Sequence, residues 1–357
     1  MVAFRLTIAL LAVPATALAH HSGLYDESNI VAIDGTITAI AWINPHVRLT
    51  LATAAEGGSA TSWEVEGTSI NALERWGVQR DWFVVGERIS VRGPQSRFEP
   101  NAMIGATAEL ADGRRVVLWP NVAARLKLAD TGVDGLFPPP AAGAADIGAT
   151  VVDRSTPPSP RGIFRVWTPR SRPAADPASL PLRESAREAA RAYQPLRDDP
   201  ALQCIAPGLP VMLDTPYPVQ FVEDGDRIVM RFEEWDGMRT VYMNPRNGPR
   251  VQDPSPYGVS FGRWEAETLA IFTTYINYPY FDDLGTPQSA AVTVLERYTP
   301  SGDGERLDWV VTVTDEATFT QPVVRRGFMA YEAGESIKAY NCTLVERPGI
   351  GADGDGE

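Results

Sequence analysis

The 357-residue chain has little lysine, histidine and cysteine: two lysines, three histidines and two cysteines. Its other 30 basic residues are arginines, yet the formal net charge is −13. A nucleic acid backbone is bound by clustered basic side chains. The charge balance therefore argues against nucleic acid as a partner, and an anionic membrane surface is equally unfavourable.

Long apolar runs are absent after residue 19, so we expect no segment that spans a membrane. The first residues differ from the rest. Arg5 precedes an apolar stretch from Leu6 to Leu18, and the stretch ends in Ala17-Leu18-Ala19. A positive charge, a short apolar core and a small-x-small ending are typical of a secretory signal peptide. We therefore assign residues 1–19 as a signal peptide and predict a periplasmic or secreted protein.

Cleavage after Ala19 makes His20 the first residue of the mature chain, followed by His21. The third histidine, His46, lies in Asn44-Pro45-His46. An N-terminal histidine offers an amine and an imidazole, which suit the nitrogen-rich, tetragonal coordination of Cu(II). Three interpretations stay open: a Cu(II) chelate formed by the His20 amine with the His21 amide and imidazole, a histidine brace in which His20 is joined by His46, or a polar tail with His46 bonded to backbone in a loop.

The two cysteines, Cys204 and Cys342, are read as one disulfide, because an isolated pair in an exported protein normally pairs. Two free thiols are the alternative.

Residues 20–120 predict strand, strand, strand, helix, strand, strand. This is the order of an OB-type small barrel, with a generic β-sandwich as the alternative. The expected strands and helix are 31–42, 47–53, 61–66, helix 69–76, 88–92 and 102–118, with Gly35 marking a bend.

Residues 121–199 are rich in proline, alanine and glycine and predict a linker. Residues 164–167 interrupt it as a docked strand, and residues 184–193 form a short helix. Residues 200–348 predict an antiparallel, lipocalin-like β-barrel. Its seven expected strands are 228–232, 239–243, 269–274, 291–298, 307–314, 323–331 and 336–344. The acidic tail 349–357 is expected to be disordered.

Several motifs over residues 19–118 resemble a family of exported bacterial proteins, a domain of unknown function. They are His20-His21-Ser22, Trp42-x-Asn44-Pro45-His46, Trp63-x-x-Glu66 and Leu110-Ala111-Asp112-Gly113-Arg114. The second half resembles another uncharacterised group through Gly258-x-Ser260-x-Gly262-Arg263-Trp264-Glu265 and Tyr340-x-Cys342. Members of that group often carry histidines beside a stretch that here reads Pro287-Gln288-Ser289-Ala290, so this chain departs from the pattern. Neither resemblance implies an established activity.

Aromatic residues of the second domain are the candidate ligand-binding residues: Trp235, Trp264, Tyr275 and Tyr278. Aromatics at a barrel mouth can hold a small apolar or aromatic molecule, whereas core packing is the alternative. For catalysis, Asp282-Asp283 is the nearest approach to paired carboxylates, and a solvated turn is the favoured interpretation. Gly258–Gly262 has the spacing of a nucleophile elbow, but its all-β context and lack of a nearby histidine argue against a serine hydrolase.

These observations predict an exported binding protein with a copper site at the mature N-terminus and a barrel that binds a small apolar or aromatic ligand. The alternatives are a periplasmic enzyme, such as a lyase, an isomerase or a copper-dependent oxidoreductase, and a scaffold for protein contacts.

Overall fold

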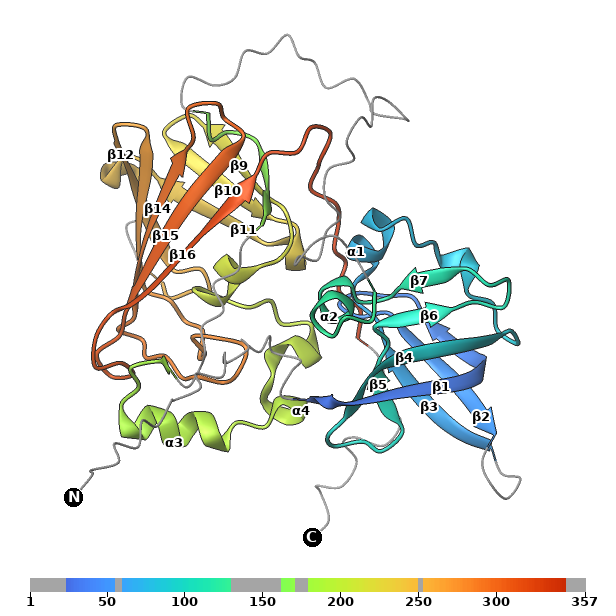
Figure 1. Cartoon of the computed structure of the whole chain (residues 1–357). Coiled ribbons are helices and arrows are strands. Elements are labelled where there is room, and N and C mark those ends of the chain that lie inside the picture. Colours follow the sequence, from blue (N-terminus) through green and yellow to red (C-terminus); the bar gives the residue numbers. More distant parts are fainter. Residues whose placement is uncertain (1–23, 55–59, 130–161, 171–178, 250–252, 345–357) are drawn as a thin grey trace, which may run out of the picture.

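A computed structural model describes residues 24–54, 60–129, 162–170, 179–249 and 253–344. The predicted signal peptide, His20, His21, the predicted acidic tail and much of the predicted linker lie outside these residues. Within them the chain forms two β-barrels that stand side by side (Figure 1). No helix among the described residues is long and apolar enough to cross a membrane.

The N-terminal barrel has the strand order of an OB-type fold, as predicted. Strands run in the order β1-β2-β3-β5-β4, and β4 pairs back to β1 to close the barrel. The β3–β5 pair is parallel and the other pairs are antiparallel. The strands are β1 (Tyr25–Ala41), β2 (Arg48–Ala54), β3 (Ala60–Glu66), β4 (Arg88–Ser96) and β5 (Ala102–Ile104).

Local sequence explains these elements. In β2 the side chains alternate, with Leu49 and Leu51 buried. The predicted bend in β1 is made where Gly35 crosses β2, since a Cβ at Gly35 would lie 3.0 Å from the Cβ of Leu51. Helix α1 (Ile70–Arg75) begins where the Ser69 side chain accepts a hydrogen bond from the Ala72 amide.

The single strand expected over residues 102–118 is broken into three. Strand β5 is followed by β6 (Thr107–Glu109) and β7 (Arg115–Val117), which extend the sheet beyond β4. Helix α2 (Pro120–Arg125) then packs through Val122 and Ala123 in a small buried cluster. The first domain therefore continues through α2.

The C-terminal barrel is closed by nine strands, in the order β10-β11-β12-β13-β14-β15-β16-β8-β9. Short helices α3 (Glu184–Ala192), which matches the predicted one, and α4 (Pro195–Asp198) lie between β8 and β9 along the chain. The strands are β8 (Val166–Pro169), β9 (Val219–Asp224), β10 (Arg227–Phe232), β11 (Met238–Tyr242), β12 (Val259–Glu265), β13 (Thr268–Thr274), β14 (Thr293–Pro300), β15 (Arg306–Thr314) and β16 (Val323–Ala330).

Three details of this barrel differ from the sequence-based expectation. Strand β8, expected only to dock, completes the wall between β16 and β9 and carries the fully buried Trp167. Strands β9 and β12 were not predicted, and the short β11–β12 pair is parallel. The strand predicted over residues 336–344 is wrong: apart from an isolated bridge between Asn44 and Cys342 this segment forms no strand.

The barrel core contains an ion pair among its apolar side chains. Arg239 and Glu296 are joined by two hydrogen bonds of 2.7 and 3.0 Å, and their side chains are 1% and 0% exposed. Arg239 also donates to Ser260 and Thr273, and Tyr298 donates to Glu296. Burial and the Glu296 charge raise the pKa of Tyr298. This polar network occupies inward positions that a ligand-binding barrel would leave open.

Candidate ligand cleft between the domains

A cleft of about 580 Å³ lies between the two barrels. This volume falls in the range of small-molecule sites, roughly 300–1,000 Å³. The OB domain contributes Tyr25, His46, Arg48, Glu66 and Trp119, among others. The C-terminal domain contributes Trp235 and Tyr278, together with residues between Pro195 and Tyr217 and the end of the described chain.

His46 follows β1 in a loop and faces this cleft. Its Nδ1 lies 3.2 Å from the Gly67 carbonyl oxygen and 3.7 Å from Glu66 Oε1. Its ring stacks on Trp119 with centroids 5.1 Å apart. Because a carbonyl oxygen only accepts hydrogen bonds, Nδ1 carries the proton in this contact. The neutral imidazole then has its lone pair on Nε2, the tautomer suited to binding a metal or accepting a proton.

Glu66 is the buried carboxylate behind His46, with 5% of its surface exposed. Tyr25 Oη donates to it at 3.2 Å, and Arg48 Nη2 lies 3.8 Å away. Burial, followed by the charge of Glu66, raises the pKa of Tyr25, so its hydroxyl remains a donor. The His46 side of the cleft is therefore a preorganised group of polar side chains.

The opposite wall includes a strained loop between β10 and β11. Trp235 and Asp236 have φ angles of 61° and 52°, in the left-handed region that side chains other than glycine disfavour. Such strain costs on the order of 1–3 kcal/mol per residue and is often found at functional sites. Here it accompanies a tryptophan that lines the cleft, next to the lining carboxylate of Glu234.

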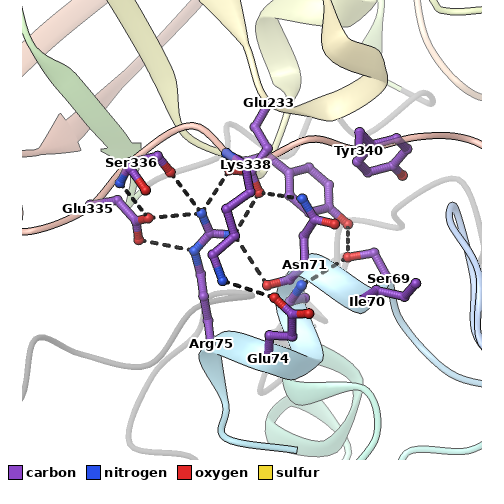
Figure 2. A network of polar contacts seen from close by, with 12 residues as sticks. Ser69, Ile70, Asn71, Glu74, Arg75, Glu233, Glu335, Ser336, Lys338 and Tyr340 are labelled. Atoms are coloured by element: carbon purple, nitrogen blue, oxygen red, sulfur yellow. Dashed lines mark hydrogen bonds and ion pairs between the residues drawn. The ribbon is translucent and has the colours of Figure 1, made fainter. Parts of the chain in front are cut away.

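The same loop attaches the barrel to the OB domain (Figure 2). Glu233, whose side chain is 0% exposed, receives two hydrogen bonds of 2.6 and 2.8 Å from Arg75 of α1. Arg75 also pairs with Glu335 at 2.9 Å, and Asn71 donates to Glu233 at 3.0 Å. We call Asn71, Arg75, Glu233 and Glu335 the domain junction. It fixes one wall of the cleft relative to the other.

The segment 336–344 runs along this junction instead of joining the barrel, which corrects the predicted last strand. Asp236 accepts hydrogen bonds from the Tyr340 and Asn341 amides, and Glu233 accepts one from the Lys338 amide. Asn44 of the OB domain donates to the Tyr340 carbonyl. These partners satisfy the backbone that a barrel neighbour would otherwise have paired.

The predicted disulfide is present: Cys204 and Cys342 are bonded, with Cα atoms 5.8 Å apart. The bridge spans 138 residues, for which the chain-entropy argument gives a stabilisation of about 5 kcal/mol. Cys204, Thr343 and Leu344 all line the cleft. The disulfide therefore ties the end of the described chain to the rim of the cleft.

The candidate ligand-binding residues separate into two groups. Trp235 and Tyr278 line the cleft, together with His46. Trp264 instead packs against Phe164, with ring centroids 6.1 Å apart, and Tyr275 is 45% exposed on the barrel surface. The structure thus brings two of the four aromatics to the histidine side of the molecule and leaves two elsewhere.

Sequence reasoning missed several cleft residues, namely Tyr25, Glu66, Trp119, Asp199, Glu234 and Asp283 as lining groups. Glu66 and Trp119 have a local signal, since Glu66 ends one predicted strand and Trp119 directly follows another, and residues at strand ends gather at a barrel end. The carboxylates carry no spacing signal, because they converge from four separate segments of the chain.

The two motifs considered for catalysis have structural explanations. Asp282 accepts hydrogen bonds from the Leu284 and Thr286 amides and from the Thr286 hydroxyl, which makes the expected turn. Burial raises the pKa of Asp282, and this effect outweighs the hydrogen bonds, which act to lower it. Ser260 lies on β12, not on an elbow, and is buried against Arg239 and Thr273. A serine nucleophile there is excluded by its burial.

Residues 8–103 match the model of a family of unknown function, DUF6152. The match supports the resemblance of the N-terminal domain to a domain of unknown function, and it includes His46 and Glu66. No curated protein matches the chain.

Proposed function

We propose that the protein is an exported binding protein whose ligand site is the cleft between the domains, with a copper ion held at its edge by His20, His21 and His46. The proposal rests on one observation: Trp235 and Tyr278 of one domain line the same cleft as His46 of the other. The aromatic walls and the volume suit a small apolar or aromatic molecule.

Copper binding is supported by the orientation of His46. Its Nδ1 faces Gly67 and Glu66, the outer-shell arrangement that orients a metal-binding imidazole through its other nitrogen. Leu24 lines the cleft and lies four residues after His20. Four residues span at most about 14 Å, so His20 and His21 are within reach of the cleft. Cu(II) bound by such nitrogens supplies a Lewis acid or redox centre.

Export is supported by the signal-like residues 1–19 and by the disulfide, since disulfides persist in oxidising compartments. We propose the periplasm or the extracellular space as the location.

Copper titration of the mature protein tests the metal site. Protein that begins at His20 is compared with the same protein acetylated at its N-terminal amine and with the His46→Gln variant. We expect each change to weaken Cu(II) affinity by more than about tenfold, because each removes a nitrogen ligand. Arg263→Gln, at an exposed position on β12, is the control. Equal affinities in all four proteins would contradict the copper site.

A second candidate function is catalysis by His46 as a general base, as in a lyase or an isomerase. The observation that favours it is the Glu66 carboxylate 3.7 Å from Nδ1, which would stabilise the imidazolium formed when Nε2 accepts a proton. His46→Gln would then abolish turnover of a bound molecule and leave its binding intact. If His46→Gln instead removes only the binding of the molecule, the result favours a binding protein over an enzyme.

A further inference from the structure

The charged groups of the cleft are divided unequally between its walls. Six carboxylates line it: Glu27, Glu66, Asp199, Asp214, Glu234 and Asp283. The two lining arginines, Arg48 and Arg125, both belong to the OB domain, where they approach Glu66 and Glu27. The wall formed by residues 195–344 contributes four carboxylates, of which Asp214 is paired with the buried Arg325, and its described lining residues include no arginine, lysine or histidine.

The negative charge of that wall raises the pKa of the tyrosines beside it. Burial raises the pKa of Tyr278, and the charges of Asp283 and Asp199 raise it further. The same two carboxylates act on Tyr193. Asp199 and Asp283, which are 84 positions apart in the sequence, therefore lie on one side of the cleft near Tyr278.

A second part of the wall combines rings with Glu234. Trp235 lies 5.5 Å from Tyr340, and Tyr340 lies 5.6 Å from Tyr217, measured between ring centroids. Burial and then Glu234 raise the pKa of Tyr217, so this phenol is neutral. Neutral aromatic faces attract cations, with tryptophan the strongest of them.

We infer that the cleft selects a small molecule with an apolar or aromatic body and a single positive charge, such as a protonated or quaternary amine. This inference rests on the proposed binding function and adds the charge of the ligand. Aromatic faces and carboxylates both favour a cation in a partly desolvated cleft, where charges interact more strongly than in water. The same groups repel a carboxylate ligand.

A matched series of probes tests the charge: 4-phenylbutyl-trimethylammonium, 4-phenylbutan-1-ol and 4-phenylbutanoate. Calorimetry on copper-free protein at pH 7 excludes coordination of the probe by metal, and the quaternary amine has no lone pair. We expect the cation to bind about tenfold or more tighter than the alcohol and the carboxylate to bind most weakly.

Two isosteric variants, Glu234→Gln and Asp283→Asn, locate the effect. Each should weaken binding of the cation by about tenfold and leave the alcohol unchanged. Glu267→Gln removes an equal charge from an exposed residue outside the cleft and is the matched control. Urea unfolding of each variant shows that it is folded.

The outcomes separate the two proposals. If the three probes bind within about twofold of one another, and Trp235→Ala weakens all of them equally, the cleft binds ligands but the inference on charge is wrong. If none of the probes binds, both the inference and the binding function proposed for the cleft are overturned.

Discussion

Two buried arginine–glutamate pairs with similar geometry serve different parts of this molecule. Arg239 on β11 and Glu296 on β14 lie within one barrel, and all their partners belong to that barrel. Arg75 and Glu233 join two domains and share their hydrogen bonds with the segment 335–338. Both pairs are bidentate and both carboxylates are fully buried.

The comparison shows that location decides what such a pair stabilises. Removal of the glutamate leaves the buried Arg239 charge without a carboxylate, whereas Arg75 keeps its ion pair with Glu335. Loss of the barrel pair destabilises the strands of the barrel. Loss of the junction pair instead weakens the contact that positions one folded domain against the other. Because the cleft lies between those domains, only the second pair is coupled to the proposed ligand site.

Loss of the barrel pair should have the largest effect. Glu296→Gln leaves the Arg239 charge buried without a carboxylate, so we expect the free energy of unfolding to fall by about 3–5 kcal/mol. Urea denaturation measures the change. Asp308→Asn, which breaks the exposed pair with Arg306, should cost less than about 1 kcal/mol. A loss below that level for Glu296→Gln would mean that the network contributes little.

Loss of the junction pair should have an intermediate and localised effect. We expect Glu233→Gln to cost about 2–3 kcal/mol, since Arg75 keeps its bonds to Glu335. Hydrogen exchange should accelerate in α1 and residues 335–343, with β13 to β15 unchanged. Glu74→Gln, which affects the more exposed pair with Lys338, is the control. Equal acceleration throughout the barrel would show that the two pairs do not act separately.

The strained backbone at Trp235 should produce a smaller effect on the free energy of unfolding, in which glycine is more stable than alanine. At a φ of 61° glycine is favoured over alanine, so Trp235→Gly should be more stable than Trp235→Ala by about 1 kcal/mol. Both variants lose the same indole contacts, so the difference in their free energies of unfolding isolates the backbone. An alanine variant as stable as the glycine variant would contradict the strained conformation.

The pH dependence of the junction is expected to be the smallest effect. Burial acts to raise the pKa of Glu335, but its hydrogen bonds with Arg75 outweigh burial and lower the pKa below the ordinary value of 4.5. A lowered carboxyl pKa means that the stabilisation is present above pH 4.5 and is lost as the pH falls through the folded-state pKa. Hydrogen exchange of α1 between pH 6 and pH 3 should show this loss, and Glu335→Gln should reduce it.

Much of the fold could be predicted from sequence, because strand alternation and turn residues are local. The OB strand order, helix 69–76 and most strands of the second barrel follow from such patterns. The segment 336–344 shows the limit. Its apolar and polar residues resemble a strand, but its amides bond to Asp236 and Glu233, which periodicity along the segment does not reveal.

The candidate site was only partly predictable. His46, Trp235 and Tyr278 could be selected by residue type, but Trp264 and Tyr275 belong to the same types and lie outside the cleft. The sequence assigned the histidines and the aromatics to separate domains, and nothing in it indicated that one cleft would include both. Among the acidic residues of the wall, only Asp283 was singled out, as part of the Asp282-Asp283 pair, because the others are unremarkable in their own segments.

The sequence alone determined the two barrels, the signal-like N-terminus and the cysteine pairing, since local periodicity and the presence of only two cysteines are sufficient for these. The tertiary structure decided the cleft, its acidic wall and the junction that holds it. Those features depend on contacts such as Arg75–Glu233 and Asn44–Tyr340, between residues 158 and 296 positions apart. Such pairings are set by how the two barrels pack and by the burial of their charges.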